Sequence, residues 1–456
     1  MTRFLVILFC LVVSVPAFAA KGKVLDVQVI KAPPGAEAWL VEDHTVPVIS
    51  MSFSFEGGIA YDPDDKPGVG RLISTLLDEG AGDMKSQEYQ GKLEENAISM
   101  SYTAGRDAFY GSVATLSANR AIAFDLLALA LSKPRFDQDA IDRMKNANVA
   151  QIKKDLGDPS WLVARTFNGM LFEGHYYARP GFGNLDSMNA ITRKDLLDFV
   201  AAQFGRNVLK VSIAGDISKD DAEKAVEKIF GPLPEKAEPN DLPEVQPGYG
   251  GKIIMLPLDT PQTFISVGEA GIKRTDKDWH AAMVMNCILG GSSFDARLMK
   301  EIRAKRGLTY GVYSSLSSMK HAGILQANMS ASNDKVEEAL RLLKESWAEM
   351  SKDGPTTDEF QNAKSYLTGA LPLELTSTGD IAGALNGIQR DGLGADYINK
   401  RNDIINALSL GDIKRVAARL LKADQLAIVL VGKPRNINVD ILLDKPPGMG
   451  GDGKTP

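Results

Sequence analysis

The stretch GVGRLISTLLDEG, residues 68–80, is the most informative part of the sequence. At helical spacing its aliphatic side chains share one face: Leu72, Ile73, Leu76 and Leu77. Its polar side chains share the other: Arg71, Ser74, Thr75 and Asp78. The spacing predicts a helix over 68–80 that packs through its aliphatic face, because such a stripe is typical of helices that cover a core.

Around this stretch the chain consists of two similar halves, roughly 200 residues apart. In each half, two strand-like runs precede a charged turn and an apolar helix; long helices follow, and a strand next to a glycine closes the half. The runs are 38–41, 46–55, 121–132, 137–154 and 208–215, then 252–256, 262–267, 281–289, 336–350, 357–373 and 426–432. This order predicts an α+β fold.

The two halves define the expected domains. We expect homologous domains at 20–235 and 251–436, each a mostly antiparallel sheet covered on one face by helices. A Pro/Gly-rich linker, 236–250, joins them. The Pro/Gly-rich tail, 437–456, is expected to be partly disordered.

Residues 1–19 have the pattern of a secretory signal peptide, with an apolar run from Phe4 to Val15 and a small-residue cleavage signal ending at Ala19. The apolar run is short for a membrane span. We therefore expect an exported, periplasmic protein with no membrane span after cleavage. Cys287 is then the only cysteine left, in an apolar run that predicts a buried thiol. A net charge of −6 gives no sign of a nucleic-acid binder.

The run at 68–80 resembles the active-site helix of the pitrilysin/insulinase zinc metallopeptidases, a family that includes the mitochondrial processing peptidases. That helix carries His-x-x-Glu-His within G-x-x-H-x-x-E-H-x-L. With Gly68 and Leu77 in register, the motif positions hold Arg71, Ser74 and Thr75. A guanidinium offers no lone pair to a metal, and a serine hydroxyl is no base near neutral pH.

The family's third zinc ligand is a glutamate on a later helix. In the matching run this sequence has Ala150 and Gln151. A catalytic zinc needs three protein ligands, so we expect no metal in this chain. The histidines lack ligand spacing and are scattered: His44, His175, His280 and His321.

The second half retains a different family signature, an arginine and a tyrosine seven residues apart. On this resemblance Arg303 and Tyr310 are the functional pair, and Arg306 is a weaker candidate for the arginine. Both side chains are suitable donors to the oxyanion formed when water attacks a peptide carbonyl. The alternative is a surface arginine beside a tyrosine of the sheet.

Residues 98–102 alternate apolar and serine side chains, which predicts a strand at a sheet edge. In the family the matching strand holds substrate through main-chain hydrogen bonds. Ser99, Met100 and Ser101 are therefore candidate substrate-binding residues. A family loop matches residues 174–180, GHYYARP, where we expect a structural role.

The resemblance implies a non-catalytic subunit of an exported heterodimeric zinc peptidase. Its partner would be a homologue with the zinc motif, zinc would be held by that partner, and the substrate would be a peptide. Two alternatives remain open: a catalytically inert scaffold or peptide-binding protein of the same fold, and an active peptidase with an unusual metal site.

Overall fold

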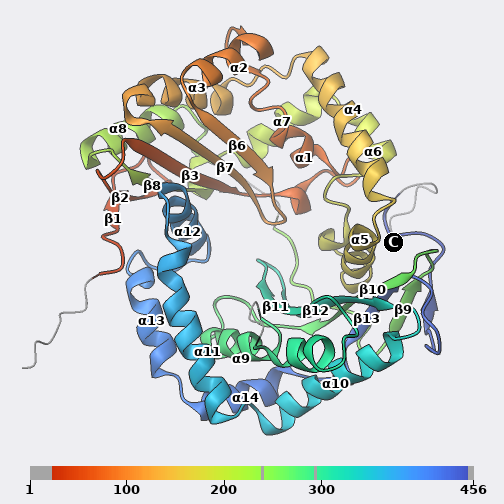
Figure 1. Ribbon diagram of the computed structural model, residues 1–456. Coiled ribbons are helices and arrows are strands. Elements are labelled where there is room, and N and C mark those ends of the chain that lie inside the picture. Colours follow the sequence, from red (N-terminus) through yellow and green to blue (C-terminus); the bar gives the residue numbers. More distant parts are fainter. Residues whose placement is uncertain (1–22, 238–240, 292–294, 450–456) are drawn as a thin grey trace, which may run out of the picture.

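A computed structural model of the chain describes residues 23–237, 241–291 and 295–449. The predicted signal peptide lies outside these residues. Two six-stranded sheets lie on opposite sides of the molecule, each with helices on its outer face (Figure 1). The predicted α+β fold is confirmed. In the described ranges no helix has the length and apolarity that crossing a membrane requires.

The first sheet contains the strands of the first half. In spatial order they are β1 (Gln28–Ile30), β2 (Glu37–Glu42), β8 (Leu209–Gly215), β3 (Val48–Glu56), β7 (Ala108–Leu116) and β6 (Ser99–Ala104). The pairings are antiparallel except for β2 with β8. The closing strand β8 is thus inserted between the first two long strands, and β6 is an edge, as its alternating sequence predicted.

The second sheet repeats this arrangement. In spatial order its strands are β11 (Val312–Ser318), β12 (Gly323–Ser332), β10 (Gln262–Ala270), β13 (Ala427–Val431), β9 (Ile253–Leu256) and β14 (Ile441–Leu442). The closing strand β13 again lies between the first two, β9 and β10. It is parallel to β9, which is also parallel to β14. The shared strand order agrees with the internal duplication seen in the sequence.

Most helices of each half lie on the outer side of its own sheet (Figure 1). Those of the first half are α1 (Val69–Ser74), α2 (Ser86–Glu95), α3 (Arg120–Ser132), α4 (Gln138–Asp155), α5 (Pro159–Leu171), α6 (Leu185–Ala190), α7 (Arg193–Gln203) and α8 (Lys219–Phe230). Those of the second are α9 (Trp279–Leu289), α10 (Val336–Asp353), α11 (Thr357–Ala370), α12 (Thr378–Arg390), α13 (Tyr397–Ala407) and α14 (Leu410–Leu420). Two of these helices, α5 and α12, lie elsewhere.

Each sheet has the predicted helical cover on one face, and its inner face is covered as well, because the halves exchange one helix each. Helix α12 of the second half packs on β3 and β8 of the first sheet, and α5 of the first half packs on β10 and β13 of the second. Figure 1 shows both helices between the sheets. Leu385 of α12 and Phe167 of α5 are buried in these contacts. Each inner face is apolar enough to need this cover.

The linker and the tail also pack against the body. Leu242 in the linker is buried, and the N–H of Val245 donates to the carbonyl of His321. In the tail, Ile441–Leu442 form β14. The described part of the tail is 437–449; residues 450–456 lie outside the described residues, so the expected partial disorder stays a prediction.

Candidate functional site

Helix α1 is anchored at its start by a buried carboxylate. Asp62 is 3% exposed and accepts the N–H groups of Gly68 at 2.6 Å and Gly70 at 2.8 Å. These are N–H groups that a helix N-terminus leaves without partners. Burial raises the pKa of Asp62 to about 7, although both hydrogen bonds favour the charged form.

The helix is shorter than the sequence predicted, since it ends at Ser74 instead of continuing to residue 80. The hydroxyl of Ser74 donates to the carbonyl of Arg71 at 2.7 Å, and that of Thr75 to the carbonyl of Leu72 at 2.8 Å. Such side-chain bonds compete with the helical ladder. The aliphatic face is buried as predicted, including the two leucines beyond the helix, Leu76 and Leu77.

Asn148 of α4 contacts two of the motif positions, Arg71 and Thr75. The Nε of Arg71 donates to Oδ1 of Asn148 at 3.1 Å, and Nδ2 of Asn148 donates to the hydroxyl of Thr75 at 3.3 Å. Asn148 is buried, whereas Ala150 is exposed. Gln151 bonds along its own helix to Asp155 at 2.6 Å. The residue of α4 that contacts the motif positions is therefore set by which face of α4 points towards α1.

Arg71 brings a fixed positive charge to the place of the first histidine. Its guanidinium lies 4.7 Å from the ring centroid of Phe182. Burial lowers the pKa of Arg71, and the nearby Asp155 carboxylate opposes this shift. A guanidinium is basic enough to stay protonated in proteins. The structure describes no group of three or more His, Cys, Asp or Glu residues arranged to hold a metal.

Strand β6 lies beside this helix. It packs on α1 and forms the edge of the first sheet. Ser99 and Ser101 are exposed, and Met100 is half-buried. The Ser101 hydroxyl lies 2.8 Å from that of Ser112 on the neighbouring strand, so it is engaged within the sheet. The main chain of β6 remains as the surface on which a further strand could pair.

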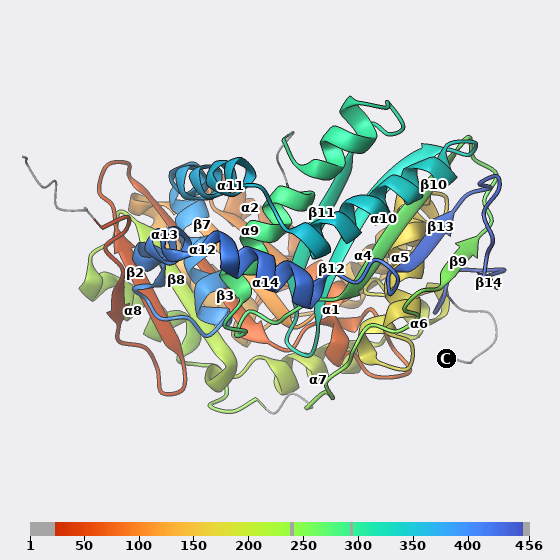
Figure 2. The same cartoon turned by 90° about the horizontal axis from the view of Figure 1, so that it is seen from below.

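Arg303 lies in a π-helix, Met299–Ala304, a rare form that occurs often at functional sites. The following loop folds back onto it, since the N–H of Leu308 donates to the carbonyl of Ile302 at 3.0 Å. Tyr310, on this loop, is 84% exposed, and Arg303 is half-buried. Figure 2 shows the segment with the colour of residues near 300 standing out from the body. Arg306 is held by Glu301 of the same turn.

The fold also brings together polar groups that the sequence left scattered. Tyr177 donates to Asp107 at 2.5 Å and accepts the N–H of His321 at 3.0 Å. The rings of His175 and His321 flank that of Tyr177, with centroids 4.7 and 6.2 Å away. Nε2 of His175 lies 3.0 Å from the carbonyl of Pro243 in the linker. The loop 174–180 thus joins both halves and the linker, which is a structural role.

Two protein-family models match the sequence of this chain. The insulinase (peptidase family M16) model matches residues 38–167, and the peptidase M16 inactive domain model matches residues 190–367. The chain belongs to the peptidase M16 (insulinase) family. The match to an M16 inactive domain includes Arg303 and Tyr310, and the insulinase match includes Arg71, Ser74 and Thr75.

Individual M16 relatives agree on the fold and differ in what their names say of activity. The chain is 28% identical to a non-peptidase homolog, YmxG, of Helicobacter pylori over 73% of this chain and 77% of that protein. It is 24% identical to an uncharacterized zinc protease of Bacillus subtilis, over 88% and 97%. A crystal structure of a peptidase M16 inactive domain from Pseudomonas fluorescens superposes with a TM-score of 0.85 at 29% identity, covering 92% and 100%.

Proposed function

We propose that this chain is the non-catalytic subunit of an exported, periplasmic heterodimeric zinc peptidase. It binds the peptide substrate and supplies Arg303 and Tyr310 to the active site of a partner. The partner is an M16 homologue that carries the His-x-x-Glu-His motif and the zinc. The chain alone does not cleave peptides in this proposal.

The observation that carries the proposal is the contrast between the two signature regions. Arg71 is a cation bonded to Asn148, so the place of the first zinc ligand is taken by a group that repels metal. Tyr310 is 84% exposed on a loop that follows a π-helix, and its hydroxyl is accessible to a second chain. The edge strand β6 supplies main-chain groups for pairing with an extended peptide.

The test combines the purified chain with an exported M16 homologue that has the intact zinc motif. Cleavage of a fluorogenic peptide is measured for each chain alone and for the mixture. We expect the mixture to cleave far faster than the partner alone. Arg303→Ala should lower kcat by roughly 100-fold, the order found when one oxyanion donor is removed.

Arg306→Ala is the matched control, because Arg306 bonds to Glu301 within its own turn. It should leave cleavage unchanged. A mixture that is no faster than the partner alone would contradict the proposal, as would full activity of the Arg303→Ala variant.

The second candidate function is an inert scaffold or peptide-binding protein of the same fold. The name of the H. pylori relative, a non-peptidase homolog, favours it. In this case the chain forms a stable homodimer, binds peptides without cleaving them and gains no activity from a zinc-motif homologue. Analytical ultracentrifugation of the chain, alone and mixed, separates the two candidates. Elemental analysis of the isolated chain tests the remaining possibility, an active enzyme with an unusual metal site.

A further inference from the structure

A cavity of about 270 Å³ lies next to the degenerate metal position, with Phe182, the ring beneath Arg71, in its wall. Three more aromatic side chains line it: Trp161, Tyr176 and Tyr177. Three guanidiniums line it as well: Arg106, Arg165 and Arg179. The described residues around this cavity include no aspartate or glutamate. The walls therefore combine apolar surface with concentrated positive charge.

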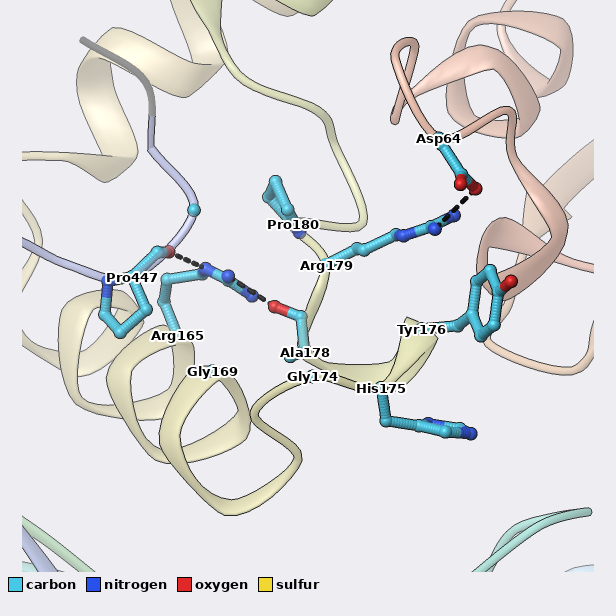
Figure 3. A pocket seen from close by; sticks show the side chains of 11 residues that line it. Asp64, Arg165, Gly169, Gly174, His175, Tyr176, Ala178, Arg179, Pro180 and Pro447 are labelled. Carbon is cyan, nitrogen blue, oxygen red and sulfur yellow. Dashed lines mark hydrogen bonds and ion pairs between the residues drawn. The ribbon is translucent and has the colours of Figure 1, made fainter. Parts of the chain in front are cut away.

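Arg165 is the least compensated of these charges. It is 7% exposed, and its Nε and Nη2 donate to the carbonyls of Pro447 at 2.8 Å and Ala178 at 2.5 Å. Figure 3 shows both bonds from the side of a neighbouring cavity that shares this arginine. Carbonyl oxygens satisfy donors but do not neutralise a buried charge, which is costly. Burial and the like charge of Arg106 lower the pKa of Arg165 to about 10.

Arg106 bonds to neutral partners too. One Nη contacts the sulfur of Met319, and the other donates to Oδ1 of Asn168 at 2.9 Å. The nearest carboxylate is that of Asp107, whose oxygens already accept the Tyr177 hydroxyl and the N–H of Lys320. Arg106 therefore adds to the positive charge of the cavity.

Arg179 has a carboxylate partner, but an exposed one. Its Nη2 lies 2.6 Å from Asp64, whose side chain is 82% exposed, and Figure 3 shows this pair on the rim of the neighbouring cavity. Water screens the exposed carboxylate of Asp64, so the pair offsets the charge of the largely buried Arg179 only in part. Of the three guanidiniums, Arg179 is the one with a carboxylate partner in direct contact, and the carboxylates of Asp107 and Asp62 act on Arg106 and Arg179 from nearby.

The cavity also lies at the end of the proposed peptide-binding edge. Strand β6 ends at Ala104, and Arg106 follows two residues later. The carbonyls of Gly105 and Arg106 accept the N–H groups of Ile59 and Ala60, which line the cavity. A peptide paired with β6 would thus have one end beside the cavity.

We propose that this cavity is a subsite for a carboxylate of the bound peptide, held by the guanidiniums of Arg106 and Arg165 with its carbon stem against the aromatic wall. The carboxylate is that of an acidic side chain or of the chain terminus. Guanidinium is the group best suited to paired hydrogen bonds with a carboxylate. The volume fits one side chain. The subsite rests on the proposed function only in assigning the carboxylate to a peptide.

The first experiment uses small probes on the full chain. Phenylacetate should raise Tm in a concentration-dependent way, because it binds the folded state alone. Phenylacetamide, with the same shape and no charge, should leave Tm unchanged. Arg106→Gln should weaken phenylacetate binding by roughly 10- to 100-fold in isothermal titration. Equal binding of the acid and the amide, or binding of neither, would overturn the subsite.

Ala164 offers a variant that leaves the arginines in place. It is exposed on α5 and lines the cavity. Ala164→Glu adds a tethered carboxylate, and Ala164→Gln is its neutral match. We expect the Glu variant to have the higher Tm without probe and to bind phenylacetate at least 10-fold more weakly. Equal phenylacetate affinity in the two variants would count against the subsite.

Peptides then identify the source of the carboxylate. Four versions of one peptide are compared, with Glu or Gln inside and with a free or amidated C-terminus. A preference for Glu assigns the side chain, and a preference for the free acid assigns the terminus. Peptide binding without either preference overturns the subsite and leaves the proposed function intact. Selective binding of phenylacetate without any peptide binding supports the anion site and counts against the proposed function.

Discussion

Around α1 the polar side chains at the motif positions bond inward, whereas the loop after the π-helix carries Tyr310 outward. Arg71 bonds to Asn148, and the hydroxyls of Ser74 and Thr75 bond to carbonyls of their own turn. Tyr310 is 84% exposed, and within the described residues its hydroxyl forms no hydrogen bond. The motif side chains of the first region are part of the packing, whereas the second region exposes a tyrosine to solvent.

The comparison teaches that a helix can lack the family's zinc-binding side chains and still be needed for the fold. Leu72, Ile73, Leu76 and Leu77 are each at most 1% exposed, so the segment belongs to the core of the first half. Burial explains these residues, and internal hydrogen bonds explain Arg71 and Thr75. Packing does not explain the exposed ring of Tyr310.

The first prediction tests whether the backbone around α1 can still hold a zinc ion when the ligands are restored. Failure to bind zinc would contradict the comparison. We expect that Arg71→His, Ser74→Glu and Thr75→His, combined with Asn148→Glu, create a chain that binds one zinc ion. Asn148 contacts both other positions, so a glutamate there completes the three ligands that zinc requires. This is the largest expected effect, since assembled zinc sites contribute on the order of 10 kcal/mol. Inductively coupled plasma mass spectrometry after dialysis measures the metal.

The matched control carries Ala150→Glu in place of Asn148→Glu. Ala150 is exposed on α4, so its glutamate should not reach the metal, and zinc affinity should be lower by orders of magnitude. If the two combinations bind zinc equally, Asn148 is not the third position.

The exchanged helices give the next largest effect, on the coupling of the halves. Phe167 of α5 is 2% exposed against the second sheet, and Leu385 of α12 is 0% exposed against the first. Phe167→Ala should cost about 3–5 kcal/mol and Leu385→Ala about 2–5 kcal/mol of unfolding free energy. Each should shift one common transition in urea, because each helix belongs to both cores.

Tyr366→Ala on α11 serves as the control, since this side chain is 46% exposed and should change stability by less than about 0.5 kcal/mol. Two separate transitions, only one of which moves in each variant, would show that the halves unfold independently.

Local patterns predicted much of this fold. The duplication, the strand next to each closing glycine, the edge position of β6 and the burial of Cys287 all depend on periodicity or composition within short runs. The exchange of α5 and α12 could not be predicted in this way, because an amphipathic helix does not specify which sheet it covers. The length of α1 depended on the hydroxyls of Ser74 and Thr75, whose competing bonds its apolar pattern does not encode.

The candidate site was predictable only where a motif exists. Arg71, Ser74, Thr75, Arg303 and Tyr310 come from motif positions. Asn148 carried a usable signal, since it shares one helix face with Ile152 and Asp155, which are also buried. Arg106 and Arg165 carried none: they are distant in sequence and converge only in the folded chain.

A buried aspartate precedes the first helix of each half: Asp62 before α1 and Asp278 before α9. Their pKa values are shifted in opposite directions. Burial raises the pKa of Asp62 to about 7, whereas Arg415 and Arg419 lower that of Asp278 to about 2. In the unfolded chain both titrate near 4. The contribution of Asp62 therefore falls as pH rises from about 4 to 7, and that of Asp278 is lost as pH falls from about 4 to 2.

Two variants measure these opposite slopes. The destabilisation caused by Asp62→Asn should shrink between pH 4 and 7. That caused by Asp278→Asn should be about 1–2 kcal/mol at pH 7, allowing for solvent screening of the half-exposed arginines, and should disappear near pH 2. Urea unfolding across pH gives both. Burial also raises the pKa of Glu269 to about 7. Its effect on the unfolding free energy is the same in every chain compared, so it cancels from the differences between variants. If the destabilisation caused by the two substitutions changed with pH in the same direction, the assigned opposite roles of Asp62 and Asp278 would be wrong.

The smallest expected effect on stability comes from Tyr310. Its 84% exposure means that Tyr310→Phe should change the unfolding free energy by less than about 0.5 kcal/mol, because no packing is lost. In the mixture with a zinc-motif partner the same variant should lower kcat by roughly 100-fold, since it removes only the hydroxyl that would donate to the oxyanion. Tyr313→Phe, a half-exposed tyrosine on β11, is the control and should change neither quantity. A stability loss matching the activity loss would mean that Tyr310 serves the fold, and the outward-facing region would then differ from α1 only in exposure.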